Sequence, residues 1–260
     1  MNARDAGRTV EPRAVERPVE PRPVERAVAP RVAYEPDTGK AVRVLRRALE
    51  EVEAGRLIVT TAFGPGGMSV LHLLRGLGAR LPVVFIDTLY HFPETLAFAR
   101  EVARRWDLDL RIYQPAVSRR AFEAAFGPRL WERDLDRYHE LTKVEPMRRA
   151  LPGVRGWITA RRRDQASTRR SLSTFEDGDP PRFNPLAAWS RDDVWRYVHA
   201  NGILYHPLHD RGYASVGDQP LTTPIDSGEH ERAGRWRGLE RTECGLHFIG
   251  RDVRPEPGAT

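Results

Sequence analysis

Short apolar runs alternate with helical repeats in the first half of this chain, and few folds accommodate such a pattern. The apolar runs cover residues 56–63, 81–87 and 108–113, and helical spacing of apolar residues covers 42–52, 68–77 and the stretch from Pro93 onward. This alternation predicts an α/β fold with a mostly parallel sheet flanked by helices. Such sheets bind ligands beyond the carboxyl ends of their strands, so function is expected in the loops that follow the runs.

The second half of the chain contains fewer regular patterns. We expect the folded part to begin near Tyr34. We also expect a helical stretch over roughly 130–151, a fourth strand over 156–159, a polar loop over 175–182 and a helix from Ser190 to about Gly202. In that last helix Trp195 and Val198 are expected to face inward.

Residues 1–33 differ from the rest in composition. The sequence VEPRAVERP is followed directly by VEPRPVERA over residues 10–27, and prolines interrupt both copies. Proline blocks a continuous helix, and two copies are too few for a solenoid. We interpret this stretch as a disordered or polyproline-like extension, with a docking arm as the alternative.

The cysteine count and the charge exclude several classes. Cys244 is the single cysteine, which excludes an internal disulfide, a CxxC redox pair and a cysteine-ligated iron–sulfur or zinc site built from this chain alone. A net charge of +6 is too small to imply nucleic-acid binding without a basic patch. No apolar run approaches the ~20 residues of a transmembrane helix, and no secretory signal is evident. We expect a cytoplasmic protein without membrane, nucleic-acid or metal partners.

Two predicted loops follow the first two strands. The glycine-rich turn at 60–69 leads into a helix, where backbone N–H groups bind anions, but its spacing fits neither the dinucleotide fingerprint nor the Walker loop. A plain glycine turn is the alternative. The second loop, 87–95, carries Asp87 and His91. Capping of the helix at Pro93 is the alternative to acid–base or metal chemistry there.

Two later segments could also carry chemistry. The arginines at 161–163, 169 and 170 follow the fourth predicted strand, where they could hold a polyanion, although a solvated face is the alternative. Cys244 lies in the sequence ECGLH at 243–247. Thiolate chemistry needs an accessible sulfur near positive charge, and an inert buried cysteine is the other interpretation.

These segments together resemble the phosphoadenosine phosphosulfate (PAPS) reductases of sulfate assimilation, over about residues 40–250. The resemblance implies a Rossmann-like, adenine-nucleotide α-hydrolase-like fold with a modified pyrophosphate loop. It is carried, in order, by TTAFG at 60–64, DTLYHFPET at 87–95, KVEPM at 143–147, RRDQ at 162–165 with Arg169, YHPL at 205–208, GYASVGD at 212–218, GRW at 234–236 and TECGLH at 242–247.

The resemblance implies a reaction and a reductant. The Cys244 thiolate would attack the sulfur of 3′-phosphoadenylyl sulfate, adenosine 3′,5′-bisphosphate would leave, and an S-sulfonated cysteine would remain. Thioredoxin or glutaredoxin would then release sulfite. A homodimer is also implied. Within each chain we expect a nucleotide-binding reductase domain over 34–216 and a C-terminal segment that carries the cysteine over 217–260.

The resemblance also implies roles for individual residues. Contacts to the phosphosulfate are expected from Thr60, Thr61, Phe63 and Gly64, contacts to the adenosine from Thr88 and Leu89, contacts to the sulfate from Lys143, Arg232, Arg235 and His247, and contacts to the 3′-phosphate from Arg162 and Arg169.

The chain departs from some relatives in ways that bear on its substrate. Relatives that use adenosine 5′-phosphosulfate (APS) and carry a four-iron cluster have cysteines where this chain has Tyr138, His139, Asp218 and Leu221, so no cluster is expected. Ala62 replaces a usual serine, and Ala160 replaces a common glycine. A cluster-free APS reductase is the first alternative. An ATP pyrophosphatase or adenylyltransferase is the second, and its usual Ser-Gly-Gly-x-Asp-Ser loop is missing.

Overall fold

The computed structural model describes residues 38–239, 241, 243, 245, 246 and 249. The extension expected over 1–33 and the start expected near Tyr34 therefore lie outside the described residues. The first described element is helix α1 (Thr38–Glu51). Of the helices that the structure describes, none combines the length and the apolar character needed to cross a bilayer.

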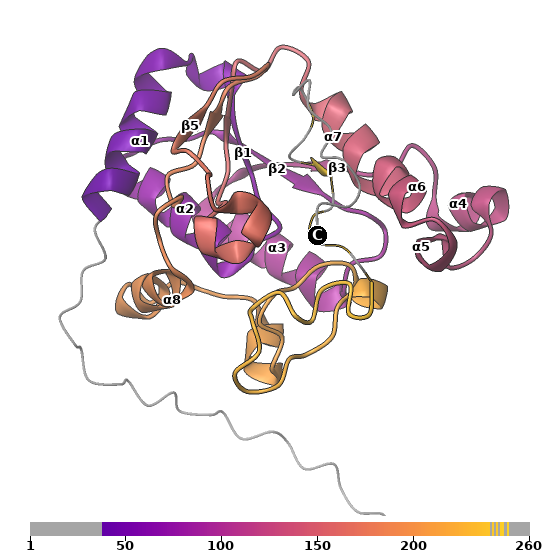
Figure 1. Cartoon of the computed structure of the whole chain (residues 1–260). Helices are drawn as coiled ribbons and strands as arrows, with labels where there is room; N and C mark the ends of the chain where they lie inside the picture. Colours follow the sequence, from indigo (N-terminus) through magenta and orange to yellow (C-terminus); the bar gives the residue numbers. More distant parts are fainter. Residues whose placement is uncertain (1–37, 240, 242, 244, 247–248, 250–260) are drawn as a thin grey trace, which may run out of the picture. The chain divides into compact units, whose positions relative to one another are not determined.

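A six-stranded sheet forms the centre of the described chain (Figure 1). Its strands are β1 (Leu57–Thr60), β2 (Pro82–Ile86), β3 (Asp109–Tyr113), β4 (Gly156–Ile158), β5 (Phe175–Glu176) and β6 (Arg182–Phe183), in the spatial order β3-β2-β1-β4-β6-β5. Every neighbouring pair is parallel except β5 with β6. The predicted α/β class and the four predicted strands are confirmed.

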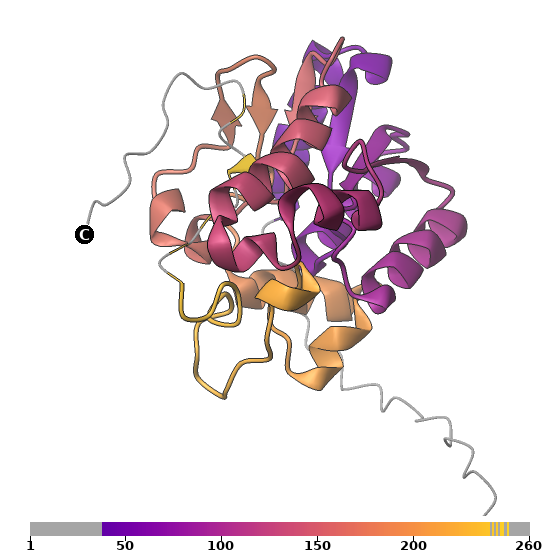
Figure 2. The ribbon, with the colours of Figure 1, turned by 90° about the vertical axis from the view of Figure 1, so that its right-hand side faces the viewer.

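Helices cover both faces of this sheet. The remaining helices are α2 (Pro65–Gly76), α3 (Pro93–Trp106), α4 (Arg119–Phe126), α5 (Leu130–Arg133), α6 (Leu135–His139), α7 (Glu145–Ala150) and α8 (Arg191–Ala200), with short 3₁₀ turns at 54–56, 163–165, 167–169, 207–211 and 219–221. Successive strand residues point to opposite faces. Leu57 and Val59 thus join a core cluster with α1, α2, α3 and α8, whereas Ile58 joins a cluster with α7. Figure 2 shows the helices of residues 119–150 in front of the sheet.

The helical stretch predicted over 130–151 is confirmed, with one break at Asp134. Asp134 separates α5 from α6 with φ −152° and ψ 86°, and its carboxylate accepts a hydrogen bond from the backbone N–H of Arg137 at 2.8 Å. Aspartate side chains compete for backbone N–H groups in this way, which favours a cap over a helix interior. Residues Glu140–Val144 then form a π-helical turn before α7. Such turns are common at functional sites, and this one carries Lys143.

The prediction of a polar loop over 175–182 is wrong at its two ends. Its two ends form β5 and β6, an antiparallel pair that extends the sheet beyond β4. Each of these strands has two residues, which is too short to produce a recognisable alternation of apolar and polar side chains.

Candidate functional site

A cavity lies at the carboxyl ends of β1, β2 and β4, the edge at which ligands of parallel sheets are expected. Its wall is formed by residues from 60–67, 84–86, 159–169 and 214–218, and by a later group that comprises Glu231, Arg232, Arg235, Trp236, Glu243 and Leu246. Trp195 also lines it and is half-buried, whereas its neighbour on α8, Val198, is buried as predicted.

The turn between β1 and α2 presents backbone to this cavity. The N–H of Phe63 donates to Thr61 Oγ1 at 2.8 Å, and the Phe63 ring turns inward to contact Phe85 in the core. A Cβ on Gly67 would lie 2.1 Å from Thr61 Oγ1, so only glycine allows the loop to approach the helix this closely. Three residues of the first turn of α2, Pro65, Gly66 and Gly67, line the cavity. The first N–H groups of a helix have no partner within it, and such groups bind anions.

Lys143 is fixed in the cavity wall by a buried carboxylate. Its Nζ donates to Asp218 Oδ2 at 2.5 Å, and Thr88 Oγ1 donates to Asp218 Oδ1 at 2.8 Å. Burial alone would raise the pKa of Asp218, but the charges of Lys143 and His91 outweigh it and hold that pKa below its ordinary value. Asp218 is thus ionised, and the ammonium group of Lys143 is held in one place.

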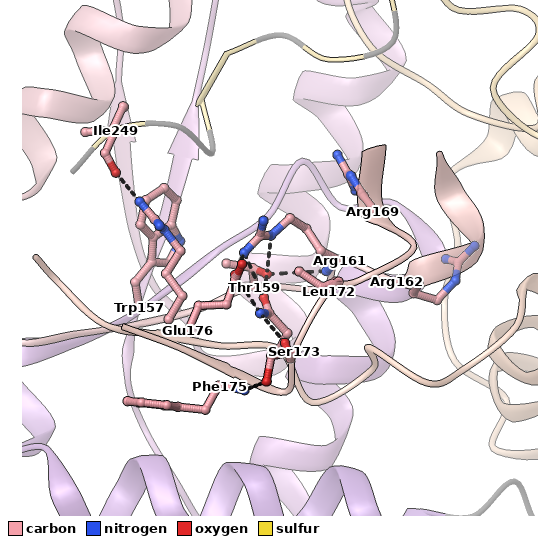
Figure 3. A network of polar contacts seen from close by, with 12 residues as sticks. Trp157, Thr159, Arg161, Arg162, Arg169, Leu172, Ser173, Phe175, Glu176 and Ile249 are labelled. Carbon is pink, nitrogen blue, oxygen red and sulfur yellow. Dashed lines mark hydrogen bonds and ion pairs between the residues drawn. The ribbon is translucent and has the colours of Figure 1, made fainter. Parts of the chain in front are cut away.

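Three of the arginines that follow β4 are bonded to carboxylates. Arg161 pairs with Glu176 and contacts Thr159 in the network that Figure 3 shows. Arg162 donates from Nη2 to both carboxylate oxygens of Glu231, at 2.8 and 2.9 Å.

The third, Arg169, forms a two-pronged pair with Glu243. Its Nε and Nη2 donate to the two carboxylate oxygens at 2.5 and 2.6 Å. Burial would raise the pKa of Glu243, but its hydrogen bond to Arg169 and the charge of that arginine lower it. Glu243 is therefore ionised at neutral pH.

Arg232 and Arg235 form a further cationic part of the wall. Their guanidinium carbons lie 5.3 and 4.6 Å from the ring centroid of Trp236. The indole Nε1 of Trp236 in turn donates to His139 Nε2 at 3.4 Å. A Cβ on Gly217 would lie 2.3 Å from the guanidinium carbon of Arg235, so a side chain there would displace this arginine.

The structure brings most of the predicted site residues together. Eight of them line the cavity: Thr60, Thr61, Gly64, Lys143, Arg162, Arg169, Arg232 and Arg235. Phe63, Thr88 and Leu89 do not line it; Thr88 is bonded to Asp218, and Leu89, with φ 69°, packs beside Tyr90. Cys244 and His247 lie outside the described residues, but Glu243 and Leu246 beside them line the cavity.

Three acidic residues of the site had no predicted role. Asp218, Glu231 and Glu243 each pair with a predicted cation of the cavity wall. Asp218 and Glu243 lie inside the segments that carry the family resemblance, so a search for a partner to each buried cation would have found them. No pattern marked Glu231, which lies 69 residues from Arg162.

The positions that hold cysteines in cluster-bearing relatives are occupied by residues of other kinds. Tyr138 and Leu221 belong to an aromatic and apolar cluster. Burial, with a contribution from Lys143, lowers the pKa of His139 to about 2, so this histidine is neutral. Within the described part of the chain, no group of three or more His, Cys, Asp or Glu side chains is placed to hold a metal ion.

The chain is similar to known sulfonucleotide reductases in sequence. Residues 56–224 match the model of the phosphoadenosine phosphosulfate reductase domain. The chain is 40% identical over 199 residues to a phosphoadenosine 5′-phosphosulfate reductase of Gloeobacter violaceus, covering 74% of this chain and 82% of that protein. It is 39% identical over 196 residues to an adenosine 5′-phosphosulfate reductase of Anoxybacillus flavithermus, covering 74% and 83%.

The fold agrees with this result. The crystal structure of a phosphoadenylyl-sulfate reductase from Candida auris, a phosphate complex, superimposes with a TM-score of 0.63 at 36% sequence identity. The match covers 70% of this chain and 90% of that one.

Proposed function

The chain belongs to the phosphoadenosine phosphosulfate reductase family, a family of sulfonucleotide reductases that act in sulfate reduction, and we propose that its substrate is 3′-phosphoadenylyl sulfate. The products are sulfite and adenosine 3′,5′-bisphosphate. The observation that carries the proposal is the cavity itself, in which Lys143, Arg232 and Arg235 line the same wall as the β1–α2 turn.

The reaction proceeds in two exchanges at sulfur. The Cys244 thiolate attacks the sulfuryl sulfur and forms an S–S bond, while the S–O bond to the phosphate breaks and its electron pair leaves with the nucleotide. A thiolate of a reduced dithiol protein then attacks Cys244 Sγ, and sulfite leaves with the electron pair of the S–S bond. The partner's second thiol reduces the resulting mixed disulfide and becomes oxidised. Because Cys244 is the chain's single cysteine, both electrons come from the external dithiol, thioredoxin or glutaredoxin.

The charges of the cavity suit this chemistry. An anionic thiolate that attacks an anionic sulfuryl group is opposed by repulsion, which fixed cations offset. Lys143 is held by Asp218, and Arg235 is held over the Trp236 ring, so neither has to reorganise during the reaction. The same cations favour the thiolate over the thiol.

The choice between PAPS and APS depends on one phosphate group. Arg162 and Arg169 are the two candidates for contacting the 3′-phosphate, and each already holds a carboxylate. We assign the contact to Arg162. If Arg162 binds the phosphate, Glu231 has to give way. Comparing kcat/KM for the two nucleotides tests the assignment, and a value for APS equal to or above that for PAPS would reject it in favour of an APS reductase.

The central experiment is intact-mass spectrometry after incubation with PAPS and without reductant. We expect a gain equal to one sulfonate group, located on the Cys244 peptide. The Cys244→Ser variant should bind adenosine 3′,5′-bisphosphate with unchanged affinity, gain no mass and release no sulfite. If that variant retained full turnover, the proposed nucleophile would be wrong. We further propose that the protein is cytoplasmic and forms a homodimer. Light scattering on the purified protein tests whether it is a dimer.

A further inference from the structure

The described residues between 241 and 249 contact the rest of the protein at several points. Arg241 Nη1 pairs with Asp136 of α6, and its Nε donates to the backbone carbonyl of Glu243 at 2.7 Å. The side chains of Leu246 and Ile249 pack on the cluster that covers one face of the sheet. The proposed nucleophile, Cys244, follows Glu243 directly in the sequence. A contact that fixes Glu243 therefore restricts its covalently bonded neighbour.

The pair of Arg169 and Glu243 is built for rigid orientation. Two parallel hydrogen bonds join the side chains, which are 9% and 12% exposed. Thr168 Oγ1 also donates to Glu243, and the remaining Nη1 of Arg169 donates to Gln165 Oε1 at 2.5 Å. A planar guanidinium that is bonded at three nitrogens cannot rotate freely, so it fixes the carboxylate next to Cys244.

Arg182 provides a second attachment from the sheet. This β6 side chain is completely buried, its guanidinium lies over the Trp157 ring at 5.0 Å, and its Nη2 donates to the backbone carbonyl of Ile249. Its Nε and Nη1 have no hydrogen-bond partner among the described residues. A buried cation without a paired carboxylate is costly, and replacing such a group with an apolar one is often neutral or stabilising. Its bond to Ile249 gives a reason for the cation to be there.

We propose that Arg169 and Arg182 are positioning residues that hold two described residues on either side of Cys244 in the sequence: Arg169 holds Glu243 through its carboxylate, and Arg182 holds Ile249 through its carbonyl. The inference rests on the proposed function only in making Cys244 the group that is positioned. It gives Arg169 a role other than binding the 3′-phosphate. A misplacement of about 1 Å can cost 10²-fold in rate, so loss of either attachment should act on kcat.

The kinetic test compares Arg169→Gln, Glu243→Gln and the double variant. We expect each single variant to lower kcat roughly 10- to 100-fold, with the dissociation constant of adenosine 3′,5′-bisphosphate unchanged. The double variant should be no slower than the slower single variant, because both changes remove one interaction. Arg169→Lys, which keeps the charge but not the two-pronged geometry, should fall between wild type and Arg169→Gln.

Hydrogen exchange supplies a readout that does not require reductase activity. In Arg169→Gln, Glu243→Gln and Arg182→Met, amides of 241–249 should exchange at least tenfold faster, while those of β1 and α2 stay unchanged. Arg182→Met should not lower the free energy of unfolding by more than about 1 kcal/mol. The matched control is Arg237→Gln, which breaks an equally two-pronged pair with Glu229 that does not touch this stretch.

If Arg169 instead binds the 3′-phosphate, the Arg169→Gln variant should show the opposite changes in nucleotide binding and hydrogen exchange. If Arg169→Gln weakened binding of adenosine 3′,5′-bisphosphate but not of adenosine 5′-monophosphate, and left exchange of 241–249 unchanged, Arg169 would be a phosphate ligand and the proposal would be overturned. A wild-type protein without reductase activity would contradict the proposed function, while the exchange result would still decide how the stretch is held.

Discussion

Single glycines determine how closely groups approach one another in the cavity wall. Gly67 lies against Thr61 and Gly217 lies against Arg235, and an added Cβ would come within 2.1 and 2.3 Å of their side chains. Neither glycine has a positive φ, so the requirement is space and not backbone conformation. In both places the absent side chain allows a proposed ligand-binding residue to take its position.

The substitution Gly67→Ala should weaken nucleotide binding. The new methyl group would push Thr61 away from the position in which its Oγ1 accepts the Phe63 N–H, and so distort the turn between β1 and α2. We expect the dissociation constant of adenosine 3′,5′-bisphosphate to rise roughly tenfold, about 1.4 kcal/mol, and stability to fall by about 1–3 kcal/mol. Isothermal titration calorimetry and urea unfolding measure the two effects.

Gly76→Ala is the matched control because Gly76 ends the same helix. A Cβ there would meet nothing within 4 Å, and its φ is not positive. Alanine should raise stability by up to about 1 kcal/mol and leave binding unchanged. If the two variants bound the nucleotide equally well, close packing of Gly67 on Thr61 would not matter for the site.

Among the helices and strands, the spacing of apolar residues predicted those whose formation depends on neighbouring residues in the sequence. The runs over 56–63 and 81–87 gave β1 and β2 because buried parallel strands are continuously apolar. The break at Asp134 was missed because apolar spacing continues across it, and the capping preference of one residue outweighs that spacing. Strands β5 and β6 are set by pairing with β4, a long-range contact that has no sequence signal.

A buried histidine joins α3 to the 3₁₀ turn at Pro207–Arg211 and should make stability depend on pH. His206 Nδ1 accepts the Leu208 N–H at 3.2 Å, and its Nε2 lies 2.9 Å from Thr95 Oγ1. Burial, with the charge of His209, lowers the pKa of His206 to about 4 from an ordinary 6.5. The unfolded chain therefore binds more protons between these values, so this contribution is complete above pH 6.5 and is lost as the pH falls toward 4.

The variant His206→Asn isolates this contribution. The asparagine carbonyl can accept the Leu208 N–H but does not titrate, so the slope of unfolding free energy against pH between 4 and 6.5 should decrease by up to about 1.4 kcal/mol per pH unit. Urea unfolding at a series of pH values measures it. His139 and His209, whose pKa values are also lowered, are present in both proteins and cancel in the difference. Equal slopes would show that His206 titrates normally in the folded protein.

On the scale of the whole described chain, the cavity is formed by residues that lie far apart in the sequence. Its wall runs from Thr60 at the end of β1 to Leu246, and three of its cations, Lys143, Arg162 and Arg169, pair with carboxylates 69 to 75 residues away. The family resemblance implied eight of the lining residues, and some of these, such as Thr61 and Arg162, also lie in loops at the carboxyl ends of parallel strands, which meet at one edge. It did not indicate which cation meets which carboxylate, since pairing across such distances depends on the path of the chain.

Because the wall combines early and late residues, nucleotide binding should stabilise residues 38–239 as one cooperative unit. At a ligand concentration of 100 times the dissociation constant, adenosine 3′,5′-bisphosphate should add about 2.7 kcal/mol, which corresponds to a rise in Tm of about 5–10 °C for a protein of this size. Differential scanning calorimetry should show one transition that moves as a whole. Arg235→Gln, which removes a cation of the wall, should reduce the rise, whereas Arg237→Gln, outside the cavity, should leave it intact. A rise that Arg235→Gln does not change would place the nucleotide somewhere other than this cavity.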